Sequence, residues 1–197
     1  MENQHKEIAL EAGDSEDGVV SAITIVVPVF NERDNVEELA NRLDGKLSEV
    51  LDWELVFVDD NSPDGTSDKV RELAREDERI NLIFRHNRRG LSSAVVEGAL
   101  AASNDIIVVM DGDLQHDESV IPKLVACVQS GEADIASASR FLTETGADGL
   151  SSEARRSISE TGISLANRLF KLEMTDPLTG FFAFRRNVLL RALPHLT

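Results

Sequence analysis

The sequence predicts an α/β fold in which a mostly parallel central sheet is flanked by helices. Short apolar runs alternate along the chain with amphipathic stretches of helical spacing, which is the pattern of βαβ units. The chain has 197 residues, 42% of them apolar, which is enough to bury one sizeable core. Polar clusters follow three of the apolar runs, and open parallel sheets bind ligands at the carboxyl ends of their strands.

The expected strands are continuous apolar runs that stop at turn-forming or charged residues. The run at 23–29 is β-branched almost throughout, as is typical of a strand buried on both faces. In chain order, the expected strands are 23–29, 55–58, 80–84, 105–110, 135–138 and 181–184.

The expected helices carry apolar residues three and four positions apart, so that each can bury one face. Asp34 or Asn35 caps the first helix, Thr66 starts the second, and Pro122 sits in the first turn of the fourth. A loop rich in Gly, Ser, Thr and Asp is expected at 143–152. In chain order, the expected helices span 36–51, 66–74, 91–102, the segment after Pro122, the region of 158–170, and 186–193.

Charge and composition exclude several classes of protein. There are 36 Asp and Glu against 20 Lys and Arg, a net charge of −16, which disfavours nucleic acid as a partner because phosphate backbones are bound by basic clusters. Residues 1–20 are acidic and poor in apolar side chains, so a disordered tail is expected before a domain at 21–197. One cysteine cannot form an internal disulfide, and no run of about 18 apolar residues occurs, so a cytoplasmic location is expected. The excess of carboxylates is also consistent with a salt-rich cytoplasm.

Acidic residues follow three of the expected parallel strands, at 31–32, 59–60 and 111–113. The carboxyl ends of parallel strands lie at one edge of the sheet, so these clusters would crowd negative charge into one crevice. A bound cation would neutralise that charge. The sequence therefore predicts a divalent metal at this edge.

The segment Asp111-Gly112-Asp113 is the predicted metal site. Gly112 is expected to let the backbone turn tightly between the two carboxylates. Carboxylates suit Mg2+ or Mn2+, which take few protein oxygens and leave positions open for a diphosphate. Gln115 is expected to add a carbonyl ligand or to hold a metal-bound water, whereas His116 is expected at the surface or behind the ligands rather than in catalysis.

Two common nucleotide-binding patterns are missing from the sequence. No G-x-G-x-x-G follows the first strand and no G-x-x-x-x-G-K-[ST] occurs anywhere, which disfavours a dinucleotide fingerprint and a P-loop. Phosphate would therefore be bound by metal and arginine. Arg85, Arg88 and Arg89 precede the helix at 91–102 and either contact a base or phosphate or are solvated turn charges.

Five segments, in this order, resemble the motif set of family 2 glycosyltransferases. Within that family they are most similar to dolichyl-phosphate (polyprenyl-phosphate) mannose synthases, and the resemblance extends from residue 23 to about residue 190. The segments are PVFNE at 28–32, VDDNSPDGT at 58–66, GLSSA at 90–94, MDGDLQH at 110–116 and TDPLTGF at 175–181.

The resemblance implies a GT-A fold for nucleotide-diphospho-sugar transfer. It also implies a hexose moving to a dolichyl or polyprenyl phosphate with inversion, the first choice of donor being GDP-mannose. The nucleotide-binding residues implied, together with Arg89 of the arginine cluster, are Pro28, Phe30, Glu32, Asp59, Asp60 and Asp111. The metal ligands implied for Mg2+ or Mn2+ are Asp111, Asp113 and Gln115. The catalytic residues implied are Asp113, with Arg140 and Arg156 near the acceptor phosphate.

Five features depart from the family pattern, of which two are mild: GLSSA replaces the commoner GLGTA at 90–94, and Asp-Gly-Asp replaces Asp-Ala-Asp at 111–113. Phe30 stands where many members have Tyr, and Phe182 stands where a basic residue is usual. The sequence stops at Thr197, before the family's last strand and its basic acceptor segment, so we expect the domain to lack that segment. Peripheral contact with the cytoplasmic face of a membrane is expected, and an amphipathic face near 158–170 either provides that contact or packs against the core.

Other functions remain open at this point. A glucosyl or aminosugar transferase that uses a UDP-sugar and the same lipid acceptor would carry nearly the same motifs. A catalytically inactive nucleotide-binding module is a second alternative. A phosphoacceptor receiver domain is disfavoured because the chain is too long and has no Lys between Lys69 and Lys123.

Overall fold

The computed structural model describes residues 22–138 and 180–195. The expected tail at 1–20, the loop at 143–152 and the helix near 158–170 lie outside the described residues. In chain order the elements are β1 (Ile23–Val29), α1 (Val36–Leu47), β2 (Trp53–Asp59), α2 (Thr66–Glu76), β3 (Ile80–Phe84), α3 (Leu91–Ala101), β4 (Ile106–Val109), the 3-10 helix η1 (Glu118–Val120), α4 (Ile121–Ser130), β5 (Ile135–Ser137), β6 (Phe182–Arg185), α6 (Arg186–Ala192) and the 3-10 helix η2 (Leu193–His195).

The described strands form one sheet of six, in the order β3-β2-β1-β4-β6-β5. β1 pairs in parallel with β2 and β4, and β2 pairs in parallel with β3. β6 runs antiparallel to both β4 and β5. The expectation of a mostly parallel sheet is confirmed, and the antiparallel part is confined to the side of the sheet that holds β6 and β5.

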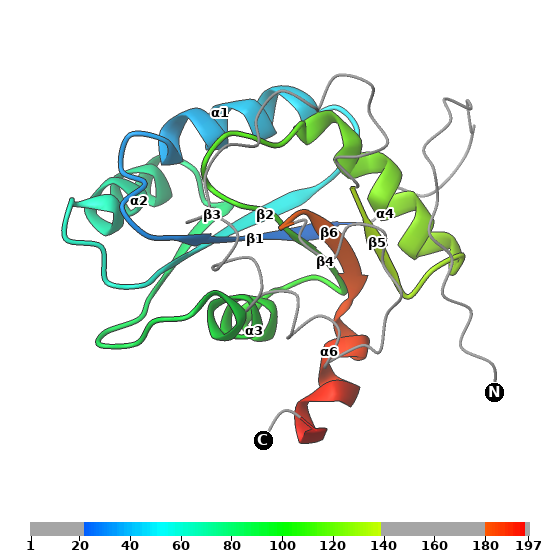
Figure 1. The fold of residues 1–197 in the computed structure, drawn as a ribbon. Helices are drawn as coiled ribbons and strands as arrows, with labels where there is room; N and C mark the ends of the chain where they lie inside the picture. The colour runs from blue at the N-terminus through cyan, green and yellow to red at the C-terminus, as the bar shows by residue number, and fades with distance from the viewer. Residues whose placement is uncertain (1–21, 139–179, 196–197) are drawn as a thin grey trace, which may run out of the picture.

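Helices cover both faces of this sheet (Figure 1). α1, α2 and α4 lie on one face, and α3 and α6 lie on the other. Successive side chains of a strand point to opposite faces, so Ile25 of β1 packs under α1 and α4 whereas Val26 packs toward α3. Because both faces are covered, the central strands are apolar at nearly every position.

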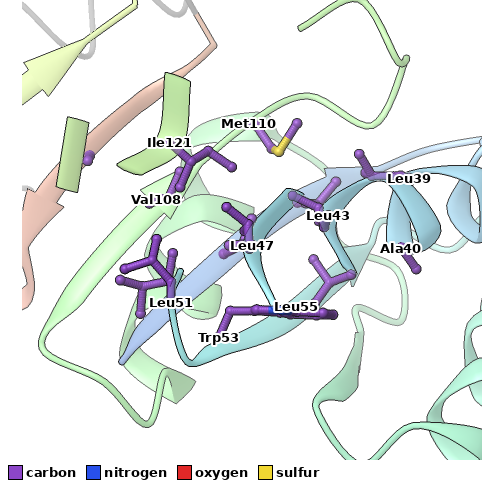
Figure 2. Packing of buried hydrophobic residues seen from close by; sticks show 14 of the residues in the cluster. Leu39, Ala40, Leu43, Leu47, Leu51, Trp53, Leu55, Val108, Met110 and Ile121 are labelled. Atoms are coloured by element: carbon purple, nitrogen blue, oxygen red, sulfur yellow. The ribbon is translucent and has the colours of Figure 1, made fainter. Parts of the chain in front are cut away.

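The larger core lies beneath α1. Leu39, Leu43 and Leu47 recur at helical spacing on the buried face of α1 and are fully buried. Figure 2 shows these leucines above the sheet, close to Leu55 of β2 and to Met110, which follows β4. The amphipathic pattern read from the sequence therefore corresponds to the packing of this helix.

Most elements differ from expectation at one end or both, usually by one or two residues, and two of the differences have a clear local cause. β2 begins at Trp53 rather than at residue 55, because Trp53 is buried and Glu54 accepts a hydrogen bond from Thr24 Oγ1 at 2.7 Å. α1 ends at Leu47 rather than at residue 51, and the N–H of Ser48 donates to the carbonyl of Asp44 at the helix end. Val50 and Leu51 lie in the connection to β2 rather than in a further helical turn, and there Leu51 is buried while Val50 is exposed.

In the part of the chain that the structure describes, the helices are all too short or too polar to cross a bilayer.

Candidate functional site

The carboxyl ends of β1, β2 and β4 lie side by side, and the three acidic segments follow these ends. Val29 of β1 is in register with Asp59 of β2, and the N–H of Asp60 donates to the carbonyl of Val29 at 3.2 Å. The N–H of Met110, just after β4, donates to the carbonyl of Val26. The sequence expectation that segments 31–32, 59–60 and 111–113 meet at one edge is therefore confirmed.

The loops after β1 and β2 are locked together by hydrogen bonds from backbone to side chain. The N–H of Asn31 donates to Ser62 Oγ at 2.9 Å, and the N–H of Glu32 donates to Thr66 Oγ1 at 3.0 Å. The N–H of the next residue, Arg33, donates to Asp64 Oδ2 at 3.2 Å. The segment 62–66 therefore fixes the backbone from which Phe30 and Glu32 project.

The hydrogen bonds between the two loops favour the ionised form of Asp64. Burial by itself would raise the pKa of Asp64, but the hydroxyl and N–H of Thr66 and the N–H of Arg33 donate to its carboxylate and outweigh burial. The pKa of Asp64 is therefore lowered from its ordinary value of 3.8.

Pro28 and Glu32 stand on either side of Phe30 in the sequence, Pro28 within β1 and Glu32 in the loop that follows it. Glu32 is half-buried, and its Oε2 accepts a hydrogen bond from Asn35 Nδ2 at 2.5 Å. Asn35 is the N-cap residue of α1, as one of the two alternatives predicted, but its side chain makes no capping hydrogen bond to the helix. Pro28 is half-buried and lies opposite Val58 in the sheet.

Asp59 is fully buried and serves the loop that follows it. Its Oδ1 accepts from the N–H of Ser62 at 3.1 Å and from Ser62 Oγ at 2.5 Å. Its Oδ2 accepts from Ser67 Oγ. These bonds place Asp59 beneath the site as an organiser of the loop, and its contact with a nucleotide stays a prediction.

Asp60 joins the end of β2 to the loop before α3. Its Oδ1 accepts from Arg85 Nη1 at 2.5 Å, and its Oδ2 accepts from the N–H of Gly90 at 2.8 Å. Arg85 is buried, so the reading of this residue as a solvated turn charge is wrong. Arg89 is exposed, and its guanidinium lies 4.5 Å from the centre of the Phe30 ring. The structure therefore brings two of the predicted nucleotide-binding side chains into contact.

The Asp111-Gly112-Asp113 segment lies next to the end of β1. Gly112 is buried, and a Cβ added there would lie 3.0 Å from Val29 Cγ1. The φ of Gly112 is not positive, whereas Leu114 has a φ of 61°. The expectation that Gly112 supplies the tight turn is therefore wrong: Gly112 allows a close approach to β1, and Leu114 adopts the left-handed conformation.

The predicted metal ligands differ in exposure. The Asp111 side chain is 42% exposed, and Asp113 and Gln115 are exposed. Asp113 Oδ1 accepts from the N–H of Gln115 at 3.1 Å, and Asp113 Oδ2 has no hydrogen bond to another of the described residues. Carboxylate and amide oxygens are hard donors, so the residues present fit Mg2+ or Mn2+. No group of three His, Cys, Asp or Glu side chains in the described ranges could hold an ion, so such an ion would need Gln115 and oxygens from a bound phosphate.

Two residues lie against Asp111: His116, which was expected at the surface or behind the ligands and lies behind Asp111, and Gly180, which the sequence reasoning missed. His116 Nε2 lies 3.3 Å from Asp111 Oδ2, and the His116 ring lies 4.9 Å from the ring of Phe181. A Cβ at Gly180 would lie 2.6 Å from Asp111 Cγ, so only glycine fits there without moving the carboxylate. The sequence signal that could have identified Gly180 was the TDPLTGF segment at 175–181, which contains both Gly180 and Phe181.

Arg140 and Arg156, the residues predicted to bind the acceptor phosphate, lie outside the described residues.

Sequence comparison places the chain among sugar transferases. Residues 24–192 match the family described as glycosyl transferase family 2. A dolichol-phosphate mannosyltransferase from Pyrococcus furiosus is 40% identical over 169 residues, which are 84% of this chain and 47% of that protein. One from Saccharomyces cerevisiae is 35% identical over 173 residues, which are 87% of this chain and 63% of that protein. The chain therefore spans about half to just under two thirds of the curated relatives it matches.

Solved structures share the fold. A mannosyltransferase from Pyrobaculum calidifontis, in complex with GDP-Man and Mn2+, matches with a TM-score of 0.60 at 20% identity, over 88% of this chain and 47% of that one. Glucosyl-3-phosphoglycerate synthase from Mycobacterium tuberculosis, in complex with Mn2+ and UDP-glucose, matches with a TM-score of 0.58 at 20% identity, over 85% and 57%. The predicted GT-A fold is thereby confirmed, and with the family match over most of its length the chain belongs to glycosyl transferase family 2.

Proposed function

We propose that this chain is the donor-binding part of a mannosyltransferase that moves mannose from GDP-mannose to a dolichyl or polyprenyl phosphate. The observation that carries the proposal is one edge of the sheet. There Phe30 follows β1, the segment 111–115 follows the neighbouring β4, and Arg89, from the loop after β3, lies over the Phe30 ring. The choice of mannose and of a lipid phosphate is supported by the curated relatives, which are named dolichol-phosphate mannosyltransferase.

In this proposal the nucleotide binds over the ends of β1 and β2. The Phe30 ring and the Arg89 guanidinium offer flat faces on which a base can stack. Pro28, Glu32 and Asp60 would complete the walls of the pocket, with Asp59 holding the loop beneath it.

The donor diphosphate would lie over the segment 111–115. Asp111, Asp113 and Gln115 would hold Mg2+ or Mn2+ through their oxygens, and the bound ion would neutralise charge on the leaving diphosphate. Asp113 is exposed at the tip of the segment, which places its carboxylate where a ligand can reach it. His116 and Gly180 would keep Asp111 in place from behind.

The transfer step needs little from a side-chain base. A phosphate monoester is largely ionised at neutral pH, so an acceptor oxygen can attack the sugar carbon directly. The new bond forms to the anomeric carbon as the bond to the diphosphate breaks, and attack from the opposite side inverts that carbon. The acceptor phosphate and the donor diphosphate are both anions and repel each other. Arg140 and Arg156 are proposed to hold the acceptor phosphate in position despite this repulsion.

The acceptor also suggests where the protein works. A polyprenyl phosphate is held in a membrane, so we propose peripheral contact of the catalytic domain, residues 21–197, with the cytoplasmic face. Residues 1–20 are proposed to be an acidic disordered tail outside that domain. The net charge of −16 continues to disfavour nucleic acid as a partner.

The test is transfer of labelled sugar to a short polyprenyl phosphate from GDP-mannose, UDP-glucose and UDP-N-acetylglucosamine in turn. We expect product from GDP-mannose alone, with Mg2+ or Mn2+ and not with EDTA.

Asp113→Ala should abolish product while the protein stays folded. The matched control is Asp134→Ala, which removes an exposed carboxylate before β5. Product from a UDP-sugar would show that the donor is that UDP-sugar and not GDP-mannose. Metal-dependent GDP binding without any transfer would favour an inactive nucleotide-binding module.

A further inference from the structure

A buried arginine behind the candidate site has no part in the reaction proposed above. The Arg85 side chain is 1% exposed. Its Nη1 donates to Asp60 Oδ1 at 2.5 Å and to the carbonyl of Gly90 at 3.2 Å, and its Nη2 donates to Ser93 Oγ. Its Nε lies 3.4 Å from Glu97 Oε1. We refer to these five residues as the Arg85 cluster.

Two backbone N–H groups tie the ends of one loop to the end of β2, and the second of these ties belongs to the Arg85 cluster. At the start of the loop, the N–H of Arg85 donates to the carbonyl of Asp59 at 2.9 Å. At its end, the N–H of Gly90 donates to Asp60 Oδ2 at 2.8 Å. Gly90 has a φ of 136°, which other residues rarely adopt, so the loop can close at this position. Segment 86–89 is therefore held between two anchors on neighbouring residues.

Arg89 is carried by this loop and is itself exposed. Its guanidinium lies 4.5 Å from the centre of the Phe30 ring, on the loop that follows β1. A long, exposed side chain loses rotamer freedom when it is fixed against a ligand, and a loop that is already anchored reduces the ordering that binding requires. The geometry of the Phe30–Arg89 pair therefore depends on how well the loop is held.

We infer that Arg85 is a positioning residue for nucleobase binding, which acts by holding the 86–90 loop so that Arg89 stays over Phe30. The inference rests on the proposed nucleotide site. Asp60 then has a second task, since each of its oxygens holds one part of the loop. Arg85 acts only through other residues, because its guanidinium is enclosed by the cluster.

The test measures GDP affinity by calorimetry with Mn2+ for the full chain and for Arg85→Met, Arg89→Ala and the double variant. We expect each single variant to bind GDP about tenfold more weakly, equivalent to ~1.4 kcal/mol and within the range of a cation–π contact. The double variant should bind no more weakly than Arg89→Ala alone, because Arg85 acts through Arg89. Losses that multiply in the double variant would overturn the inference.

The matched control is Arg79→Met. Arg79 also bridges two carboxylates and lies 4.0 Å from the Trp53 ring, but it precedes β3 and so lies at the other end of that strand from Arg85. Its loss should lower stability and leave GDP affinity unchanged. Arg85→Lys keeps a charge beside Asp60 without the forked donors, so its GDP affinity should fall between wild type and Arg85→Met.

Amide hydrogen exchange tests the role of Arg85 without a ligand. The Gly90 N–H should exchange at least about tenfold faster in Arg85→Met than in wild type, because its partner Asp60 has lost its own anchor. Exchange should be unchanged in Arg79→Met. If wild type binds no GDP, the proposed function fails. Unchanged exchange over 86–90 in Arg85→Met overturns the inference whatever the nucleotide result.

Discussion

The carboxylates at the edge of the sheet differ in what their oxygens contact. Asp59 is fully buried, and donors from Ser62 and Ser67 reach both of its oxygens. Asp111 is 42% exposed and lies against His116 and Gly180, and Asp113 is exposed. A carboxylate whose acceptor sites are filled by its own loop shapes that loop, whereas one that faces solvent is free to bind a ligand.

Gly180→Ala tests the contact behind Asp111. The added Cβ would lie 2.6 Å from Asp111 Cγ, so the carboxylate must turn away. Because Asp111 is half-exposed and can move, we expect the free energy of unfolding to fall by less than about 1 kcal/mol. Metal-dependent GDP binding, measured by calorimetry, should weaken about tenfold, equivalent to ~1.4 kcal/mol. Gly45→Ala is the control, since a Cβ there meets nothing within 4 Å. Unchanged GDP binding in Gly180→Ala would show that this contact does not position Asp111.

At the scale of elements, α3 approaches the sheet at a glycine. A Cβ at Gly98 would lie 3.0 Å from Val58 Cγ2 and still closer to Val26 Cγ1, both on fully buried valines. β-Branched side chains in a packed core have little room to turn. Gly98 therefore sets how closely α3 can pack against β1 and β2.

Gly98→Ala should lower the free energy of unfolding by about 1–3 kcal/mol, the usual cost of overpacking, despite the better helix propensity of alanine. Gly45→Ala, in the exposed part of α1, should raise it by about 0.5–1 kcal/mol. Urea unfolding of both variants measures the two effects. Equal changes in the two variants would contradict the close packing of α3.

Arg79 joins three elements at the amino end of β3. It bonds Asp77 and Asp44, and its guanidinium lies 4.0 Å from the Trp53 ring. The Arg79 bond holds the pKa of Asp77 below its ordinary value of 3.8, against the effect of burial. Ser48 first, and then Arg79, lower the pKa of Asp44.

These lowered pKa values make part of the stability depend on pH. A carboxyl whose pKa is lower in the folded state stabilises the fold above its unfolded pKa, and this contribution is lost as the pH falls through the folded value. Arg79→Met should therefore cost about 0.5–1 kcal/mol near neutral pH, the size expected for exposed pairs. The difference from wild type should shrink below pH 3.8, leaving the part due to the Trp53 contact. Urea unfolding across this range checks it, and a constant difference would contradict the assignment.

At the scale of the whole molecule, the charge of −16 predicts a dependence on salt. Like charges repel in the compact state, and about 1 M salt screens them to roughly 3 Å. Thermal unfolding should therefore move to higher temperature as KCl is raised toward ~1 M. A lower unfolding temperature at high salt would contradict both the repulsion and the idea of a salt-rich cytoplasm.

Local patterns account for what the sequence could predict of the fold. The strand order places the ends of β1, β2 and β4 together, and apolar runs followed by acids were enough to expect that edge. Contacts between distant segments were beyond such patterns. Arg85 looked like a turn charge because Asp60 lies 25 positions away, and the contact of Gly180 with Asp111 depends on β6 joining the sheet beside β4. The left-handed turn at Leu114 was assigned to Gly112 because glycine is the usual residue for it.

The central claim is that the carboxyl edge of β1, β2 and β4 binds a nucleotide-diphospho-sugar through metal. The most direct measurement is calorimetric titration of the full chain with GDP-mannose, with Mn2+ and with EDTA, alongside Asp113→Ala. The account predicts saturable binding at one site that needs Mn2+ and is lost in Asp113→Ala. Binding that persists in EDTA, or that Asp113→Ala leaves unchanged, would contradict it.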